Sequence, residues 1–440
     1  MSQDPPPPVA RKKTEVLAVT GGDFGKFRQN DGLEKIGTWE ASQSHGMKTI
    51  QNAATYLRVK DIPVAFPTET VYGLGADATR TAAVKGIYSA KGRPSDNPLI
   101  VHVADLDMLR YILQPSTESN GAINGSRDRI PDIYKPLIER FWPGPLTILM
   151  PNPAPSKLAP EVTAGLKTFG VRMPAAPLAR SLIKLAGIPL AAPSANASTK
   201  PSPTTAAHVL EDLDGRIELI LDGGACPVGV ESTVVDGLCD PPVVLRPGGV
   251  SIDELRKCPG WDGVKKAYKD HSESGKSTPR APGMKYKHYS PKARVILYEA
   301  TYPGVQRGID QQQVELKDNN NIVGIIRTRY WQPGGGLFSG NFEEREILAT
   351  PAEFDSPVAV ELGIREATLY ESAGGASIGK LLDIDIGKDS RSIAHGLFSA
   401  LRELDRRDAD VIFVEGTLDD EDIGAAVMNR LRKAASQIKS

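Results

Sequence analysis

The segment IPVAFPTETVYGLG, residues 62–75, joins a short apolar run to a loop that is rich in hydroxyl groups and glycine. The run IPVAFP (62–67) carries no polar side chain, which predicts a strand buried on both faces of a sheet. The following loop holds Thr68 and Thr70 at the carboxyl edge of that sheet, where ligands bind in open α/β folds. Taken alone, the loop is equally compatible with a structural turn.

The chain beyond this segment alternates helical stretches such as RTAAVKGIYSAKG (80–92) with short apolar runs such as NPLIVHV (97–103). This alternation predicts an α/β domain with a mostly buried, twisted open sheet and flanking helices. Helical periodicity begins near Met47, and SIDELRK (251–257) reads as the last helix. We therefore expect the first domain to span residues 46–257.

The regions on either side of this domain are polar. Residues 1–45 contain four consecutive prolines, Pro5 to Pro8, and no hydrophobic period, so we expect a disordered N-terminal extension. Residues 258–292 are charged and contain glycine, serine and proline, which predicts a linker. Linkers of this length are either disordered or functional.

A second α/β pattern occupies residues 293–440 and predicts a smaller, Rossmann-like domain. Its strand candidates are ARVILYEA (293–300), NIVGIIR (321–327), LLDIDIG (381–387) and VIFVEG (411–416). Its predicted helices are 357–373, 391–407 and 421–438, from their apolar spacing. The stretch GGASIGKL (374–381) nearly matches a phosphate-binding loop. Leu381 replaces the required hydroxyl residue, so we interpret the stretch as an ordinary helix-to-strand turn.

Composition excludes several classes of protein. The 440 residues carry a net charge of −1, which argues against a globally basic nucleic-acid binder. Three cysteines, none at CxxC spacing, exclude a disulfide scaffold and a cysteine-rich metal site. There is no apolar run of membrane-spanning length and no secretory signal, so we expect no membrane association and a cytoplasmic location.

The segment KGRPSDNPLIVHV (91–103) suggests an anion site. Lys91 and Arg93 supply cations and Asn97 an amide, a combination that suits a triphosphate. A solvated charged loop is the alternative interpretation, and His102 alone is more often a core residue than a ligand.

Six further motifs place a hydroxyl, an amide or an arginine at a predicted strand edge: WPGPLTILM (142–150), TFGVRMP (168–174), AAPSAN (191–196), PSPT (201–204), GVEST (229–233) and VLRPG (244–248). No Ser-His-Asp order and no paired carboxylates stand out. The set indicates a site for an anionic, phosphorylated ligand, with catalysis by positioning and electrostatics.

These motifs, in this order, resemble those of the YrdC-like threonylcarbamoyl-AMP synthases. The segment APGMKYKHYSP (281–291), followed by a second α/β domain, is similar to the long, two-domain form of that family. The resemblance covers roughly residues 45–440. It implies a nucleotidyltransferase that converts ATP, L-threonine and bicarbonate or CO₂ into L-threonylcarbamoyl-AMP and pyrophosphate. The product would pass to a separate complex that modifies tRNAs reading ANN codons.

The resemblance also assigns roles to residues. L-Threonine would be held by Thr70, His102, Arg172, the backbone of Ala192, and Ser232. ATP, with Mg²⁺, would be held by Arg93, Asn97, Thr168, Ser194, Ser202 and Arg246. Lys91 and Arg93 would act in catalysis by stabilising phosphate charge, and Tyr286 and His288 would close over the nucleotide as a lid. No residue stands out as the base for the threonine ammonium.

Three alternatives stay open at this point. A basic cleft containing Lys91, Arg93, Arg172 and Arg246 could bind RNA phosphates instead. A different ATP-dependent carbamoyl or acyl transferase would share the ATP contacts without requiring threonine. The second domain could be a packing partner that anchors the lid, or a regulatory or partner-docking domain.

Overall fold

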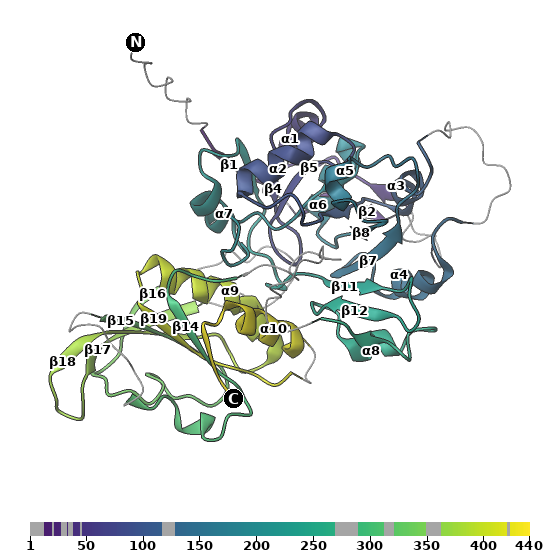
Figure 1. The fold of residues 1–440 in the computed structure, drawn as a ribbon. Helices are drawn as coiled ribbons and strands as arrows, with labels where there is room; N and C mark the ends of the chain where they lie inside the picture. The colour runs from purple at the N-terminus through teal and green to yellow at the C-terminus, as the bar shows by residue number, and fades with distance from the viewer. Residues whose placement is uncertain are drawn as a thin grey trace, which may run out of the picture.

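The computed structural model describes residues 13–19, 22–27, 33, 38–44, 46–116, 128–268, 289–311, 321–348, 362–419 and 423–440. Two α/β domains are visible, the first in purple to teal and the second in green to yellow (Figure 1). The predicted α/β class and the two-domain organisation are confirmed.

The first domain contains one mixed sheet of eleven strands. Their order is β1 (Glu15–Ala18), β10 (Leu219–Asp222), β4 (Val64–Phe66), β5 (Gly73–Asp77), β9 (Leu190–Ala191), β6 (Ile100–His102), β8 (Thr168–Arg172), β7 (Leu146–Pro151), β11 (Thr233–Asp236), β12 (Val243–Arg246) and β13 (Lys265–Lys266). The helices are α1 (Met47–Val59), α2 (Thr81–Lys91), α3 (Leu106–Ile112), α4 (Lys135–Phe141), α5 (Pro160–Thr163), α6 (Pro177–Ala186), α7 (Ala206–Leu213) and α8 (Ile252–Arg256). A single 3₁₀ turn, η2 (Asp132–Tyr134), precedes α4.

Strand β4 shows why the sequence around residue 64 forms a buried strand. Val64 and Phe66 pack in one hydrophobic cluster with α1 and α6, while Ala65 packs in the cluster on the opposite face. Successive side chains of a strand point to opposite faces, so a strand covered on both faces needs an uninterrupted apolar run. The predicted strand at 62–67 is therefore confirmed, and it forms an antiparallel pair with β5.

The second domain contains a sheet of seven strands. Their order is β16 (Glu343–Leu348), β17 (Leu362–Tyr370), β18 (Ser377–Asp385), β15 (Asn321–Arg327), β19 (Val411–Glu415), β14 (Arg294–Tyr298) and β20 (Gln437–Lys439). The strands from β18 to β20 in this order are parallel, as a Rossmann-like domain requires, and β17 and β16 add an antiparallel edge. A 3₁₀ turn, η3 (Val305–Arg307), follows β14.

Helices α9 (Ser390–Arg406) and α10 (Gly424–Ala434) lie between this second sheet and the first domain (Figure 1). Their apolar faces pack on the sheet through residues such as Leu397 and Val427. Polar residues on α9 and α10, including Arg402 and Arg430, are also buried. The two helices are therefore covered from both sides, by their own sheet and by the first domain.

The predicted helix at 357–373 is wrong over its described part. Residues 362–370 form β17, which pairs along its length with β18. Leu362, Ile364 and Leu369 are buried in the sheet's cores, so long-range pairing overrides the local helical spacing. The stretch GGASIGKL consequently connects two antiparallel strands, because β18 already begins at Ser377.

The predicted disorder of residues 1–45 is also wrong where this region is described. Strand β1 pairs in parallel with β10 at the edge of the first sheet. Two further strands, β2 (Lys26–Phe27) and β3 (Trp39–Glu40), form a ribbon on α6. The Arg180 guanidinium lies 3.6 Å from the Phe27 ring centroid and 4.2 Å from that of Trp39. These contacts depend on partners well over a hundred residues away, which the local composition does not reveal.

The predicted linker, 258–292, begins later than expected. Trp261 is fully buried in the core of the first domain, and its indole nitrogen donates to the Ile133 carbonyl at 2.8 Å. Strand β13 then extends the first sheet, so the domain continues to residue 268. Tyr286 and His288, the predicted lid residues, lie outside the described residues.

Candidate active site

A cavity of about 230 Å³ brings most of the predicted site residues together. The predicted residues that line it are Thr70, Lys91, Arg93, Asn97, His102, Arg172, Ala192, Ser194, Ser202, Ser232 and Arg246. They come from segments spread over more than half of the first domain. The ordered series of motifs is therefore one site in space.

The loop between β4 and β5 forms one wall. The Thr68 hydroxyl lies 2.9 Å from the Thr70 hydroxyl and donates to the Val71 carbonyl at 2.7 Å. The backbone N–H groups of Thr70 and Val71 donate back to the Thr68 oxygen. This network closes the loop on itself and aims Thr70 at Arg172.

Strands β6 and β8 place His102 and Arg172 side by side, because the two residues are paired in the parallel register. Arg172 donates through Nε to the Gly144 carbonyl at 3.1 Å and through a terminal nitrogen to Thr70 Oγ1 at 2.8 Å. Its other terminal nitrogen lies 2.6 Å from the Glu69 carboxylate. A guanidinium carries five N–H donors, so two remain for a ligand.

The opposite wall begins where α2 ends. Gly92 adopts a left-handed conformation (φ 60°) that stops the helix and turns Arg93 toward the cavity. Arg93 donates to the Pro98 carbonyl at 3.2 Å. Burial lowers the pKa of Arg93 to about 10, so the side chain stays charged at neutral pH.

Arg246 and Ser232 meet at the end of β12. Arg246 donates to the Ser232 carbonyl at 2.9 Å and to the Ser232 hydroxyl at 3.2 Å. That hydroxyl lies 2.8 Å from the Thr147 hydroxyl. The arginine thereby orients the serine side chain at the cavity surface.

Lys91 has a task that its sequence motif did not predict. Its buried ammonium donates to the carbonyls of Ser194 and Asn196 at 2.5 and 2.6 Å, and to Asn196 Oδ1 at 3.2 Å. An ammonium has three N–H groups, so these acceptors use them all. Lys91 therefore holds the turn at residues 194–196, and a direct contact with phosphate would require it to leave these carbonyls.

Four polar atoms among the cavity-lining residues are buried without a hydrogen-bond partner in the described structure: Arg93 Nε, Asn97 Oδ1, His102 Nδ1 and Arg172 Nη2, the last of which is ion-paired with Glu69. Burial, reinforced by the charge of Arg172, lowers the pKa of His102 to about 3, so this imidazole is neutral near pH 7. Unpaired buried polar groups are rare in folded proteins because each costs free energy. Their concentration in one cavity indicates a polar ligand.

Two further predicted ligand contacts, the backbone of Ala192 and the side chain of Thr168, differ in their position relative to the cavity. The Ala192 N–H donates to the Ile100 carbonyl at 2.9 Å, which leaves the Ala192 carbonyl as the group that could meet a ligand. Thr168 does not line the cavity. It begins β8, four residues before Arg172, so roughly 13 Å of extended strand separate the two.

Sequence reasoning missed Glu231 and Tyr289, which both line the cavity. Burial alone would raise the pKa of Glu231, but the Arg430 and Arg246 guanidinium groups outweigh it and lower the pKa to about 2. Tyr289 stacks on Phe398 of α9 at 5.3 Å between ring centroids, and burial raises its pKa to about 12. Both residues lie inside quoted motifs, GVEST and APGMKYKHYSP, but nothing local distinguishes them from their neighbours.

The described residues contain no cluster of three or more His, Cys, Asp or Glu side chains that could hold a metal ion. A magnesium ion in this cavity would therefore take its ligands mainly from a bound phosphate chain and water, which is the usual coordination of Mg²⁺ with nucleotides.

None of the described helices has the length and apolarity to cross a membrane.

Comparison with known proteins identifies the family. The Sua5/YciO/YrdC model, described as "Telomere recombination", matches residues 58–248. A second model, "Threonylcarbamoyl-AMP synthase, C-terminal domain", matches residues 250–436. The threonylcarbamoyl-AMP synthase of Schizosaccharomyces pombe is 46% identical over 408 residues, covering 90% of each chain. That of Bacillus subtilis is 41% identical, covering 88% of this chain and 92% of its own.

Two solved structures of Sua5 from Pyrococcus abyssi have the same overall fold. One is a double-alanine variant, which is 36% identical with a TM-score of 0.69 and covers 97% of both chains. The other is a complex with L-threonine, which is 35% identical with a TM-score of 0.68 and covers 97% of this chain and 99% of that one. Since both family models match in order and the relatives align along nearly their whole length, the chain belongs to the two-domain, Sua5-type branch of the threonylcarbamoyl-AMP synthase family.

Proposed function

We propose that this protein synthesises L-threonylcarbamoyl-AMP from L-threonine, bicarbonate or CO₂, and ATP, with release of pyrophosphate. The product is the activated group for threonylcarbamoylation of adenosine in tRNAs that read ANN codons. A separate complex performs that transfer, so direct RNA binding is not required. We place the reaction in the cytoplasm, in keeping with three cysteines that form no disulfide.

The observation that carries this proposal is the presence, in one cavity, of three arginine side chains and of buried polar atoms without hydrogen-bond partners. Arg93, Arg172 and Arg246 line it, and four buried atoms of the lining have no hydrogen-bond partner in the described structure: Arg93 Nε, Asn97 Oδ1, His102 Nδ1 and Arg172 Nη2. A ligand with both an anionic chain and a polar amino acid end offers partners for all of them. ATP and threonine together have this chemistry.

The threonine end fits the wall around Arg172. The two remaining N–H groups of Arg172 suit a carboxylate, which guanidinium groups bind in a bidentate manner. Neutral His102 can accept a hydrogen bond at Nδ1 from the threonine ammonium. Thr70 and Ser232 supply hydroxyls for the polar side chain.

The ATP end fits the wall around Arg93 and Arg246. Arg246 is buried and Arg93 is half-buried, and a charge that is withdrawn from water interacts more strongly with phosphate than a fully solvated charge does. Ser194, Ser202 and Asn97 add neutral contacts. ATP enters as its Mg²⁺ complex, so the metal ion is part of the substrate.

In the reaction, the bound threonine ammonium first loses a proton to solvent; the free amine then forms an N–C bond with the carbon of CO₂ and loses a second proton to solvent, which gives a carbamate. A carbamate oxygen then attacks the α-phosphorus while the bond to pyrophosphate breaks. Negative charge grows on the departing phosphates, and Arg93 and Arg246 stabilise it. His102, with its pKa of about 3, orients the amine and does not retain the proton.

The test is pyrophosphate release from Mg²⁺–ATP, with threonine and bicarbonate each present or omitted. We expect release only when both are present, and a loss of about 100-fold or more in Arg93→Ala, since one charge-stabilising donor is worth that much. Arg110→Ala is the matched control, because Arg110 is a half-buried residue of α3 that pairs with Asp107 and does not line the cavity.

Each other outcome selects a different function. Release with threonine alone would indicate an aminoacyl-adenylate synthetase. Release that needs bicarbonate but not threonine would indicate another carbamoyl transferase. No release, together with RNA binding that weakens steeply with salt, would indicate an RNA-binding module.

A further inference from the structure

The loop formed by residues 194–204 lies between the cavity and the C-terminal domain. It connects β9 to α7, and it supplies Ser194, Asn196, Lys200 and Ser202 to the cavity wall. The sequence SANASTKPSPT has little apolar content with which to pack on a core. Its shape therefore depends on polar contacts to its neighbours.

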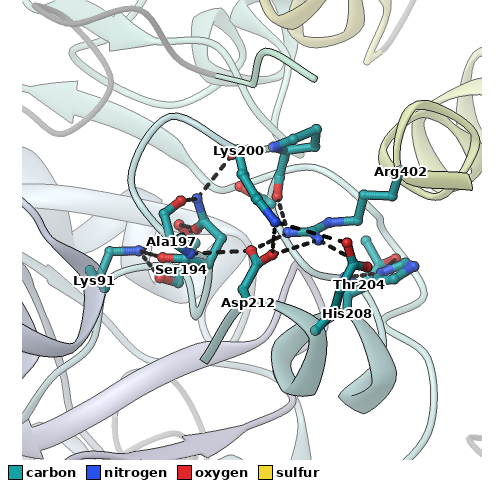
Figure 2. Close-up of polar contacts among 12 residues, drawn as sticks. Lys91, Ser194, Ala197, Lys200, Thr204, His208, Asp212 and Arg402 are labelled. Carbon is teal, nitrogen blue, oxygen red and sulfur yellow. Dashed lines mark hydrogen bonds and ion pairs between the residues drawn. The ribbon is translucent and has the colours of Figure 1, made fainter. Parts of the chain in front are cut away.

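Arg402 of α9 holds this loop from the side of the C-terminal domain (Figure 2). Its guanidinium donates to the Pro201 carbonyl at 2.5 Å and to Asp212 at 2.7 and 3.3 Å. Asp212 in turn accepts from the Ala197 N–H at 3.1 Å and from the Lys200 ammonium at 2.9 Å. One arginine thus fixes the loop at three points, directly at Pro201 and through Asp212 at Ala197 and Lys200.

Lys91 holds the same loop from the opposite side, through the carbonyls of Ser194 and Asn196 (Figure 2). The segment 194–201 is consequently clamped between α2 of the first domain and α9 of the second. Ser194, whose hydroxyl donates to Asn196 Oδ1 at 2.6 Å, lies within this clamped segment.

Arg430 of α10 makes a second set of contacts with the first domain. It donates to the Glu231 carboxylate at 3.0 Å and to the Pro247 carbonyl at 2.5 Å. The other oxygen of Glu231 accepts from the Ser202 hydroxyl at 2.5 Å. Arg430 therefore reaches the cavity at Ser202, and it also contacts the residue that follows Arg246.

These arginines are a costly way to join two domains. Arg402 and Arg430 are 4% and 0% exposed, and burying an ion pair costs desolvation that well-packed apolar side chains would avoid. What an apolar contact cannot supply is directional hydrogen bonding to a specific loop carbonyl and carboxylate. The placement of both arginines is explained if the loop geometry matters for ligand binding.

We propose that Arg402 and Arg430 of the C-terminal domain are positioning residues for the nucleotide, which act by holding the 194–204 loop and Ser202 at the cavity. This inference rests on the proposed function, in which that loop binds ATP. It gives the C-terminal domain a direct part in the site, in addition to packing.

The experiment compares KM for ATP, KM for threonine and kcat in the full-length enzyme, together with equilibrium binding of α,β-methylene-ATP and the melting temperature. For Arg402→Ala we expect KM for ATP and the analogue Kd to rise at least 10-fold, with KM for threonine changed less than 2-fold. Arg402→Lys, which replaces the planar, multidentate guanidinium by a single ammonium, should give an intermediate rise. Arg430→Ala should show the same preference for ATP.

The controls are Arg407→Ala, at the residue that directly follows α9, and Arg432→Ala on α10. Their side chains form ion pairs within the C-terminal domain, with Glu366 and Glu299 respectively. Both should bind the analogue as the wild type does. If the Arg402 and Arg430 variants match these controls in KM for ATP while losing thermal stability, the arginines only join the domains and the inference is wrong.

A double-mutant cycle covers the case in which Arg402→Ala does not fold. Asp212→Asn keeps the size of the side chain, and it should raise the analogue Kd by itself. In the double variant with Arg402→Lys, the fold-increase in the analogue Kd should be smaller than the product of the two single fold-increases. Independent effects would overturn the proposed path through Asp212. A wild-type protein that binds the analogue but releases no pyrophosphate would count against the proposed function, not against this inference.

Discussion

At the scale of single residues, His102 combines burial, a cationic neighbour and an unpartnered nitrogen. Burial and Arg172 lower its pKa to about 3 in the folded protein, against 6.5 for an unfolded chain. Between these values the unfolded state binds a proton that the folded state does not. Stability is therefore lost as the pH falls through this window.

We expect the free energy of unfolding to fall between pH 6.5 and 4.5, and His102→Asn to reduce the slope by about one proton, or ~1.4 kcal/mol per pH unit. Urea unfolding at a series of pH values measures this slope. His208, whose pKa burial lowers to about 3, contributes in the same direction, so a residual slope should persist. An unchanged slope in His102→Asn would mean that this imidazole is protonated in the folded state.

Glu69 is the counter-ion of Arg172, at 2.6 Å, and both side chains are buried. Removing one partner of a buried ion pair leaves an uncompensated charge. We therefore expect Glu69→Ala to lower the free energy of unfolding by about 3 kcal/mol or more and to weaken threonine binding. Chemical denaturation and calorimetric titration with threonine measure the two effects. Glu139→Ala, at an exposed position of α4, should stay within ~0.5 kcal/mol of the wild type.

At the scale of elements, the end of β19 places a carboxylate in a backbone anion site of the Rossmann-like domain. Glu415 is fully buried, and its carboxylate accepts from the backbone N–H groups of four consecutive residues, Thr328 to Trp331, at 2.5 to 3.2 Å. Successive backbone N–H groups that converge in this way form an anion-binding nest. Here the chain's own carboxylate fills the nest that follows β15.

Glu415→Gln should destabilise the protein by about 3 kcal/mol, because the amide turns a donor toward N–H groups that need an acceptor. Denaturation followed by tryptophan fluorescence measures this change. The matched control is Glu371→Gln at an exposed position of the same domain. A loss below ~1 kcal/mol would show that water replaces the carboxylate at low cost.

At the scale of the whole molecule, the two domains approach each other closely at Gly229. A Cβ atom added there would lie 2.4 Å from His395 Cα and 2.5 Å from the Ala394 carbonyl oxygen, both in α9. The N–H of Gly229 donates to the Thr70 carbonyl at 3.1 Å. The C-terminal domain therefore also abuts the threonine wall of the site.

We expect Gly229→Ala to cost ~3 kcal/mol or more, through backbone strain at φ +82° and the clash with α9. Gly165→Ala separates the two causes, because Gly165 has a similar φ of +81° and nothing within 4 Å of the added Cβ. It should cost only ~1 kcal/mol. Calorimetry measures the loss of unfolding free energy in each variant. Equal losses would mean that α9 moves away from the added methyl group without destabilising the protein.

The sequence by itself determined the α/β class, the two-domain layout and most of the residues that line the cavity. A buried strand is encoded by a continuous apolar run such as 62–67. The motifs that line the cavity are also short, so each can be recognised from residues that are adjacent in the sequence. Thr70, Arg93, Asn97, Arg172 and Arg246 stand in these motifs, His102 was assigned by the family resemblance, and all of them line the cavity.

Only the tertiary structure decided what depends on partners distant in the chain. It decided that 362–370 is a strand, that residues 13–19 complete the first sheet, and that Thr168 lies away from the cavity. It also decided that Lys91 holds a loop and that Arg402 and Arg430 reach the site across about 190 and 199 residues of sequence. The physical reason is that hydrogen bonds and ion pairs act over a few ångströms of space, and a local pattern of residues does not record which distant segment folding will bring within that distance.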